Sequence, residues 1–176
     1  MKFLKFLSAL FILTLTCYGQ DETFSWETAK VSNKLPLTVP YGEFQKIYKK
    51  ADSIAAPLPG QTCGTADEAN VKMLYYKGAR YEMDNGIMNF RELDFAPRKN
   101  MYFQQKDDWF DHTTTLKSFS KTYPDAALIM VTEYDENEVE WQIISLLPPE
   151  AEADCEWKFY FKANKLQRIV CEFSCD

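Results

Sequence analysis

The chain is poor in the residues on which most hydrolytic and phosphate-transfer sites depend. It has one histidine, His112, and only six glycines. A serine triad needs a histidine to accept the proton of the nucleophile, and no serine stands in a G-x-S-x-G motif. The glycines form no phosphate-binding loop, and the zinc motif H-E-x-x-H is missing. These gaps exclude the common designs of hydrolase, nucleotide-binding enzyme and zinc protease.

The mature chain is also expected to lack a membrane-spanning segment. Residues 6–15 form an apolar core behind two early lysines, and a small-residue exit follows at residues 17–19. This layout is typical of a secretory signal peptide, whereas a membrane span needs about 20 apolar residues. We therefore expect removal of residues 1–19, which leaves Gln20 first and places the protein in the periplasm or outside the cell.

A lipoprotein signal is the alternative, with Cys17 as the lipidated residue. Thr14 and Thr16 match the usual Leu-(Ala/Ser)-(Gly/Ala)-Cys pattern poorly, so the ordinary signal peptide is preferred. A signal that ends just before Gln20 resembles those of exported proteins of the Bacteroidota.

Positive charge is scarce in the mature chain. Without the two lysines of the signal, 18 basic residues oppose 26 acidic ones, which gives a formal charge of −8. Nucleic acids and anionic membranes bind through basic patches, so neither is an expected partner. A soluble acidic surface accounts for the charge, and another protein is the expected partner. No cofactor is expected.

Cysteine is sparse but even in number once the signal is removed. Four cysteines remain, which in an exported protein indicates two disulfides: Cys63, Cys155, Cys171 and Cys175. Zinc is the alternative, but Cys171 and Cys175 are not a C-x-x-C pair and His112 is distant in sequence.

A weak internal repeat organises the chain. The segments TVPYGEFQKIYKKA at 38–51 and TTTLKSFSKTYPDA at 113–126 align without gaps at an offset of 75. Thr38 in the first, and Thr113 or Thr114 in the second, can cap the start of a helix. Each helix then places three bulky residues on one face, namely Tyr41, Phe44 and Tyr48, and Leu116, Phe119 and Tyr123. Pro124 predicts that the second helix ends at about Tyr123.

Strand patterns follow each predicted helix. In the first half, residues 71–76 and 87–95 are β-prone, with turns predicted at Lys77-Gly78 and Asn85-Gly86, and residues 101–105 form a further short strand. In the second half, ALIMVTEY (127–134) and VEWQIISLL (139–147) flank a polar tip. Residues 52–70 are rich in turn formers and predict a long loop that holds Cys63.

This order predicts an α+β fold, in which two helix-then-antiparallel-strands repeats form one sheet with the helices packed on one face. The expected organisation is a signal peptide (1–19), an N-terminal extension (20–37) and a single domain (38–176), with repeat halves of about 38–105 and 113–176.

The last hairpin, CEWKFYFKANKLQRIVCEFSC, predicts the disulfide pairing. A three-residue turn at Ala163-Asn164-Lys165, with Asn164 left-handed, places Trp157 opposite Cys171, Phe159 opposite Ile169 and Cys155 opposite Phe173. One face then carries the large apolar side chains and the cysteines. Cys155 falls between Cys171 and Cys175 on the facing strand, and the freer chain end favours Cys155–Cys175 with Cys63–Cys171. The two other connectivities stay open.

An acidic cluster with the only histidine is the leading candidate for chemistry. Its members could bind a divalent metal or act as an acid–base pair: Asp107, Asp108, Asp111 and His112. The simpler interpretation is a polar loop whose carboxylates favour the positive end of the following helix, because Trp109 and Phe110 interrupt the cluster. The carboxylates of residues 135–140 likewise fit a solvated hairpin tip.

Three tryptophans bear on binding. Trp26 and Trp109 lie in loop-like segments and are the candidates for a partner surface, whereas Trp141 in an alternating strand is expected in the core.

The element order, together with FQKIYKKAD and FSKTYPDAA, resembles two families over most of residues 38–173. The β-lactamase-inhibitor proteins contain tandem helix-plus-meander units, and the small outer-membrane assembly lipoproteins contain one such unit. Both are binding proteins, so the resemblance implies an exported, non-catalytic interaction module of the bacterial envelope with an inhibitor, immunity or assembly role. The alternative is an envelope hydrolase or metal-dependent enzyme that uses the cluster at residues 107–112. A small apolar ligand held between helices and sheet would need a sizeable cavity.

Overall fold

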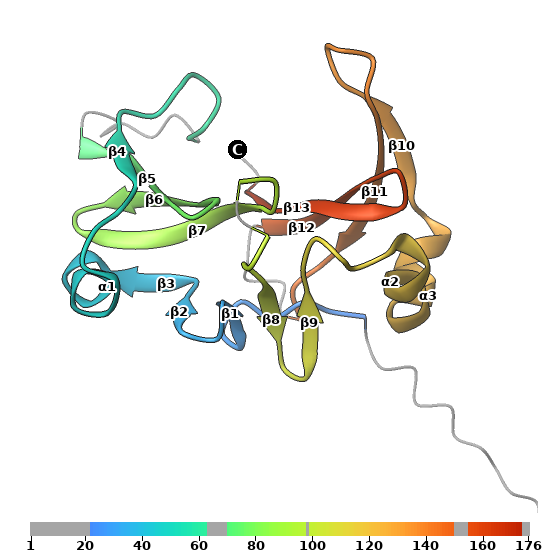
Figure 1. Cartoon of the computed structure of the whole chain (residues 1–176), viewed down its shortest axis with the longest axis horizontal. Helices are drawn as coiled ribbons and strands as arrows, with labels where there is room; N and C mark the ends of the chain where they lie inside the picture. The colour runs from blue at the N-terminus through green and yellow to red at the C-terminus, as the bar shows by residue number, and fades with distance from the viewer. Residues whose placement is uncertain (1–21, 63–69, 98, 150–154, 174–176) are drawn as a thin grey trace, which may run out of the picture.

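The computed structural model describes residues 22–62, 70–97, 99–149 and 155–173. It is mostly β, with three short helices and two antiparallel sheets of four and nine strands (Figure 1). The strands are β1 (Ala29–Val31), β2 (Leu35–Pro36), β3 (Thr38–Pro40), β4 (Ser53–Ala55), β5 (Lys72–Tyr76), β6 (Ala79–Asp84), β7 (Ile87–Asp94), β8 (Phe103–Gln105), β9 (Asp108–Phe110), β10 (Val131–Tyr134), β11 (Glu140–Leu146), β12 (Cys155–Lys162) and β13 (Lys165–Phe173). The helices are α1 (Tyr41–Tyr48), α2 (Leu116–Thr122) and α3 (Pro124–Leu128).

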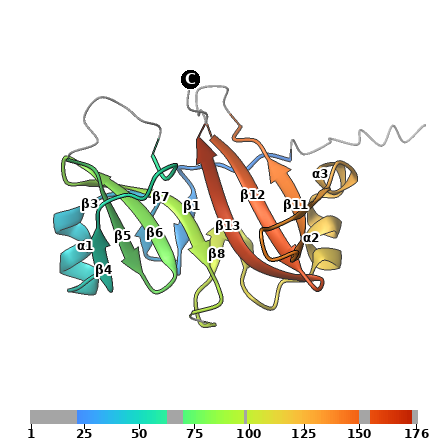
Figure 2. The same ribbon diagram turned by 90° about the horizontal axis from the view of Figure 1, so that it is seen from above.

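The larger sheet consists of two meanders that meet at its centre (Figure 2). Its strand order is β10-β11-β12-β13-β7-β6-β5-β4. In addition, β3 pairs with the first three residues of β7. At the junction of β7 and β13, Leu93 lies opposite Ile169. The helix α1 precedes the first meander, and α2 with α3 precedes the second. Helix followed by antiparallel strands, in both halves, is the order that the sequence predicts.

The two halves also share a backbone contact that joins each helix to its last hairpin. The N–H of Tyr41, the first residue of α1, donates to the carbonyl of Gly86 at 2.8 Å. The N–H of Leu116, the first residue of α2, donates to the carbonyl of Asn164 at 3.0 Å. Each helix start is therefore held by the turn of the hairpin that completes its half. The two starts are 75 positions apart, the offset of the sequence repeat.

The predicted single sheet is wrong, because a second sheet forms in the order β2-β1-β8-β9. It pairs the N-terminal segment with the segment between the halves, as in Val31 opposite Phe103 and Ala29 opposite Gln105. Figure 1 shows it between α1 and α2 on the same side of the larger sheet. Pairing over such a sequence separation leaves no local pattern, since each strand by itself has only two or three residues.

The core lies between the two sheets and the helices, and aromatic rings fill its centre. Trp157 is fully buried and packs against Phe24, Phe90 and Phe103, with ring centroids 5.1 to 6.0 Å apart. These contacts join the N-terminal segment, the first half, the small sheet and the last hairpin. Rings of this size contribute most of the apolar area that folding removes from water.

The closing hairpin has the predicted register and a different turn. Trp157 lies opposite Cys171, Phe159 opposite Ile169 and Cys155 opposite Phe173, as expected. The turn, however, has two residues, Ala163 and Asn164, with φ of 48° and 63°. A register shift between Tyr160 and Phe161 accounts for the difference of one position. The predicted turns at Lys77-Gly78 and Asn85-Gly86 are confirmed, each with two positive φ angles.

The helix starts differ from the predicted caps. Thr115, rather than Thr113 or Thr114, caps α2: its hydroxyl accepts from the N–H of Ser118 at 3.0 Å in a capping box. Thr38 lies in β3 instead of capping α1, and its hydroxyl bonds to Asn89 at 2.9 Å. In both halves, the residues just before the helix pair with the last strand of that half and are therefore extended. These residues are those of β3, which pairs with β7, and Thr115, which pairs with Lys165 of β13.

Pro124 ends α2 as predicted and then begins α3, where a first-turn proline needs no N–H partner. The carboxylate of Glu22, distant in sequence, accepts from the N–H groups of Asp125 and Ala126 at 2.9 and 2.7 Å. Residues 127–128, expected in a strand, are therefore helical, and β10 starts only at Val131. Among the described residues, no helix has the length and apolar character needed to cross a membrane.

Candidate binding surface

The face of the nine-stranded sheet opposite the core is the candidate site. Both helical units and the small sheet pack against one face (Figures 1 and 2), and in the described ranges no helix covers the other, which we call the open face. Strand register gives two rows of opposed residues across it, Arg80–Glu92–Val170–Lys158–Ser145 and Asp94–Arg168–Tyr160–Ile143–Val131.

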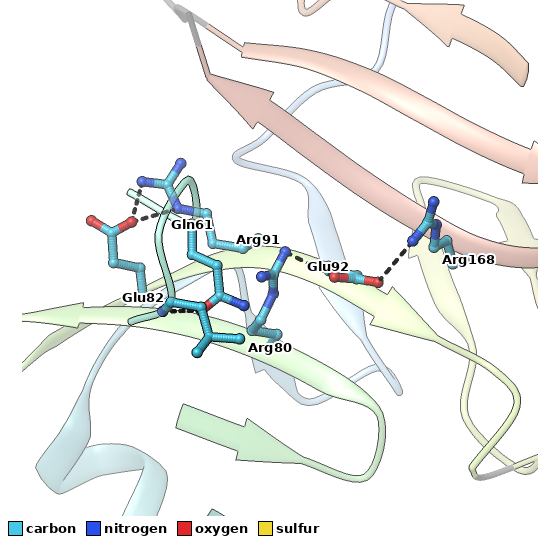
Figure 3. A network of polar contacts seen from close by, with 7 residues as sticks. Gln61, Arg80, Glu82, Arg91, Glu92 and Arg168 are labelled. Carbon is cyan, nitrogen blue, oxygen red and sulfur yellow. Dashed lines mark hydrogen bonds and ion pairs between the residues drawn. The ribbon is translucent and has the colours of Figure 1, made fainter. Parts of the chain in front are cut away.

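Charged side chains lie at the junction of the two halves. Glu92 of β7 accepts from Arg80 at 2.8 Å and lies 3.9 Å from Arg168 of β13 (Figure 3). The side chains of Arg80 and Glu92 are each 19% exposed. Partial removal from water strengthens their attraction and makes the pairing necessary, since a half-buried charge without a partner is costly. Glu92 thus ties the two halves together on the open face.

A second ion pair lies beside the first, between Arg91 and Glu82. Two guanidinium nitrogens of Arg91 donate to one carboxylate oxygen of Glu82, at 2.9 and 2.5 Å (Figure 3). The same guanidinium lies 3.9 Å from the ring centre of Phe173, a cation–π geometry. Arg91 is the extra residue at the register shift between β6 and β7. The bulge therefore brings a charged side chain to the end of β13.

An aromatic pair with an arginine lies on the same face in the second half. The rings of Trp141 and Tyr160 meet edge to face at 6.0 Å. The guanidinium of Arg168 lies 4.2 Å from the centre of the Tyr160 ring and 5.3 Å from that of Trp141. Burial raises the pKa of Tyr160, although Arg168 acts in the opposite sense. Trp141 is half-buried here, so its predicted place in the core is wrong.

Lys158 lies beside this group and is held by acidic neighbours. Its ammonium pairs with Glu172 and lies 3.6 Å from Glu156. Burial by itself would lower the pKa of Lys158, but the hydrogen bond and charge of Glu172 outweigh that effect and raise the pKa. Basic and acidic groups therefore alternate over the open face, and basic groups form no continuous patch among those described.

Two of the hollows formed by the described residues have volumes of about 150 Å³ each. One adjoins the open face and is lined by Gly60, Gln61, Thr62, Arg80, Arg91, Val170, Cys171, Glu172 and Phe173. The other is lined by Val31, Ser32, Leu35, Tyr48, Tyr76, Lys77, Asn100 and Met101. Both are smaller than the about 300 to 1,000 Å³ typical of small-molecule sites. Each has room for one side chain of a partner.

The predicted acidic cluster is dispersed by hydrogen bonds that shape the loop. Asp107 is exposed at the turn between β8 and β9, and Asp108 accepts from the hydroxyl of Tyr123 at 3.3 Å. Asp111 accepts from the N–H groups of Thr113 and Thr114 at 2.7 and 3.2 Å. Within the described ranges, no group of three or more His, Cys, Asp or Glu residues could hold a metal ion.

The pKa values in this loop follow from these contacts. Partial burial alone would raise the pKa of Asp111, but the bonds from Thr113 and Thr114 and the nearby His112 lower it overall. Burial, with the charge of Asp108, raises the pKa of Tyr123. The carboxylates of Asp108 and Asp111 thus bond to Tyr123 and to Thr113 and Thr114, whereas the Nδ1 atom of His112 is buried and no described group bonds to it.

The cysteine predictions fall partly outside the described residues. Cys155 and Cys171 are buried on the core face, and their sulfurs interact with each other. Burial, together with Cys155, raises the pKa of the Cys171 thiol well above its usual range. Cys63 and Cys175, the predicted partners, lie outside the described residues, although Thr62 lines the same hollow as Cys171.

The two tryptophans predicted for a partner surface differ in exposure. Trp26 is half-buried against Trp157 and Phe173, and its indole N–H donates to Thr38 at 3.0 Å. Trp109 in β9 is 70% exposed, with Tyr102 beside it at 6.2 Å.

Sequence reasoning missed the group formed by Trp141, Tyr160 and Arg168. Alternation in β12 and β13 already places Tyr160 and Arg168 on the face away from the core. The signal that could have found the group is their opposition in the hairpin register, which the sequence predicts. Trp141 requires the pairing of β11 with β12, which no turn motif specifies.

Comparison of the chain with protein-family models, with curated proteins and with solved structures finds no match. The chemistry of the open face therefore carries the functional argument.

Proposed function

We propose that this protein is an exported, non-catalytic module that binds another protein through its open face. One observation carries the proposal: Trp141 and Tyr160 meet edge to face with the guanidinium of Arg168 over both rings, and all three are only partly buried on the sheet face opposite the core. These are the three residue types most enriched among the residues that dominate protein–protein binding energy. A tyrosine or tryptophan offers a large apolar area with one polar atom, and an arginine offers several donors.

The surroundings of this group support a protein partner. Ion pairs at the junction hold the strands of both halves, so the surface is rigid before binding and loses little entropy on association. Acidic and basic side chains alternate around the aromatic pair, which suits a protein surface of mixed charge better than a polyanion.

The repeated order of helix and meander supports the role that the sequence suggested. Two repeats joined at β7 and β13 form a continuous sheet with helices on one side, the arrangement implied by the resemblance to tandem helix-plus-meander binding proteins. On this basis the module has an inhibitor, immunity or assembly role in the bacterial envelope, and two disulfides stabilise it.

The alternative of a hydrolase or metal-dependent enzyme has less support. Asp108 and Asp111 are engaged in bonds to Tyr123 and to the backbone ahead of α2. Their oxygens stabilise the loop and the helix start, as carboxylates near a helix N-terminus generally do.

The test compares partner capture by matched variants. Immobilised protein without residues 1–19 is exposed to envelope and secreted extracts of its source, and captured proteins are quantified by mass spectrometry. Arg168→Ala and Trp141→Ala should each reduce capture of a specific partner by at least about tenfold, because truncation of a central residue costs about 2 kcal/mol or more. Trp109→Ala, an equally large truncation on the other sheet, should leave capture unchanged.

Melting temperatures of all three variants establish that they are folded. Loss of capture in Trp109→Ala with retention in Arg168→Ala would place the partner on the small sheet and contradict the proposal. Retention in all variants would contradict it as well.

A further inference from the structure

Large apolar side chains are exposed together at one end of the nine-stranded sheet. Leu128 and Ile129, at the end of α3, are 83% and 71% exposed, and Val131 and Tyr134 of β10 are 53% and 66% exposed. The four lie within seven consecutive positions. Among the described residues, the other exposed large apolar side chains are spread over the chain: Ile47, Ile54, Leu58, Ile87, Trp109 and Leu147. By strand alternation Val131 lies on the open face and Tyr134 on the other, so these exposed side chains flank the edge strand on both sides. Exposed apolar side chains beside an unpaired edge are typical of a strand that can accept another one.

The strand that carries this group is an edge strand with backbone groups directed outward. β10 is the first strand in the sheet order and is paired on one side by β11. The N–H of Asp135 donates to the carbonyl of Val139 at 3.1 Å, so Asp135 points its backbone groups toward the chain of β11. Along an antiparallel strand, every second residue then does the same. Because inward and outward residues alternate, Val131 and Glu133 bond to β11 while Thr132 and Tyr134 present their N–H and C=O groups to the open edge.

The two edges of the sheet differ in their protection. β4, at the opposite edge, is followed closely by Pro57 and Pro59, which cannot donate to an added strand. β10 has regular register with β11 and contains no proline or lysine, the usual devices that block an edge. The edge at β10 is thus competent to accept another strand.

The charge of this region selects the chemistry of that strand. No basic residue occurs in sequence between Lys121 and Lys158, whereas five carboxylates lie at residues 133, 135, 136, 138 and 140. Lys162 of β12 is the basic neighbour that acts on Asp135, so acidic groups still outnumber basic ones at this tip. The carboxylate of Asp135 accepts from the backbone of Asn137 and Val139 and from the indole of Trp141, so the hairpin tip has a defined shape. These bonds also lower the pKa of Asp135, with the Val139 N–H the largest cause.

A second copy of the chain is a poor occupant, because it would bring the same carboxylates to the edge. A basic segment gains from attraction at the tip as well as from backbone pairing.

We propose that the β10 edge binds a basic, extended segment of a partner protein, which adds to the sheet as a further strand. Backbone groups of Thr132 and Tyr134 pair with the segment, its apolar side chains contact Leu128, Ile129 and Val131, and its lysines or arginines lie against the acidic tip. This mode of recognition takes affinity from main-chain hydrogen bonds and selectivity from side chains. The site adjoins the group around Arg168, because the indole of Trp141 bonds to Asp135 of the acidic tip. The edge itself uses Thr132 and Tyr134, so tests at those residues can succeed or fail independently of the proposed function.

The first test uses a synthetic probe. A fluorescein-labelled eight-residue peptide of alternating valine and lysine is titrated with the protein at physiological salt, and anisotropy reports binding. A matched peptide with glutamate in place of lysine should bind at least tenfold more weakly. A valine–lysine peptide N-methylated at alternate residues keeps the charge and loses the backbone donors, and it should bind at least tenfold more weakly too.

The second test uses variants of the edge. Thr132→Pro removes an N–H that the ladder does not use, so the fold should persist while peptide binding falls at least tenfold. Thr132→Val, which keeps the N–H, should bind like the wild type. Equal binding of all peptides, or of Thr132→Pro and wild type, would overturn the proposal. So would sedimentation showing that the protein alone forms a dimer that Thr132→Pro abolishes, because a second copy would then occupy the edge.

Discussion

The carboxylate of Asp111 accepts hydrogen bonds from the backbone N–H groups of Thr113 and Thr114, just ahead of α2. The hydroxyl of Thr113 donates to the same oxygen at 2.6 Å. In sequence this aspartate, beside the only histidine, was a candidate for a metal or an acid–base site, and a polar loop ahead of the helix was the preferred interpretation. Its contacts make it a structural residue, since three donors favour its ionised form.

The lowered pKa of Asp111 leads to a pH-dependent prediction. A carboxyl whose pKa is lower in the folded than in the unfolded protein stabilises the fold above the unfolded pKa, about 3.9, and loses that effect as pH falls through the folded pKa. Asp111→Asn keeps an acceptor oxygen and removes the charge, so it should cost about 0.5 to 1 kcal/mol of unfolding free energy at pH 7. The cost should decrease as pH falls below the unfolded pKa and through the lower folded pKa.

Urea unfolding at pH 7 and at pH 3 measures the difference. Asp107→Asn is the matched control, because Asp107 is exposed at a turn. The unfolding free energy of this variant should equal that of the wild type at both pH values. A cost for Asp111→Asn that is as large at pH 3 as at pH 7 would show that the charge is not responsible.

Among the elements, the hairpins were easiest to predict and one of them has a suboptimal turn. Asn85-Gly86, between β6 and β7, is the preferred sequence for two positive φ angles. Ala163-Asn164, between β12 and β13, adopts the same backbone with an alanine at φ of 48°. A residue with a Cβ atom is strained in this left-handed conformation. The turn of the second hairpin therefore lowers the free energy of unfolding, and a substitution can remove this strain.

Replacement of Ala163-Asn164 by Asn-Gly should therefore stabilise the protein. The expected gain is about 1 kcal/mol, since the left-handed backbone penalty of an alanine is removed. The bond from the Leu116 N–H to the carbonyl at position 164 uses backbone and should persist. Thermal and urea unfolding measure the gain.

The reverse change at Asn85-Gly86, to Ala-Asn, is the matched control and should destabilise by a similar amount. Destabilisation by the Asn-Gly replacement would mean that the alanine makes a contact outweighing the strain.

Helices were less predictable than hairpins because distant partners define their ends. Glu22 supplies the N-terminal acceptor of α3, and the hairpin turns supply carbonyls to α1 and α2. A local pattern identifies the amphipathic face of such a short helix, as with Phe44 and Phe119, both buried. It does not identify the residue at which the helix begins.

At the scale of the molecule, one aromatic core joins all parts. Trp157 contacts Phe24 from the N-terminal segment and Phe90 from the first half, and Phe119 of α2 packs on Phe159 at 4.6 Å. The two halves share this core as well as the junction of β7 and β13. They should therefore unfold together, although each has its own helix and meander.

Trp157→Ala tests this coupling. Loss of a fully buried indole should cost about 3 to 5 kcal/mol of unfolding free energy. Tryptophan fluorescence and far-UV circular dichroism should still report one coincident urea transition in both wild type and variant. Ile47→Ala, on the exposed side of α1, is the control and should cost less than about 0.5 kcal/mol. Two separated transitions would show that the halves are independent.

The sequence by itself determined the local features of this protein. Alternation in the last hairpin predicted which side chains of β12 face the core, and turn residues such as Asn85 and Gly86 predicted where strands reverse. The repeat predicted the order of helix and strands in each half. These properties depend on neighbours a few positions apart, so their physical causes are contained in short segments.

Only the tertiary structure decided the second sheet, the helix caps and the candidate binding surface. The pairing of β1 with β8, the bond of Glu22 to α3 and the stacking of Arg168 on Trp141 all join residues distant in sequence. Contacts of this kind form only when the complete hydrophobic core assembles. Many alternative strand pairings and side-chain contacts are compatible with the same local sequence pattern. Burial and charge pairing in the assembled fold select among them.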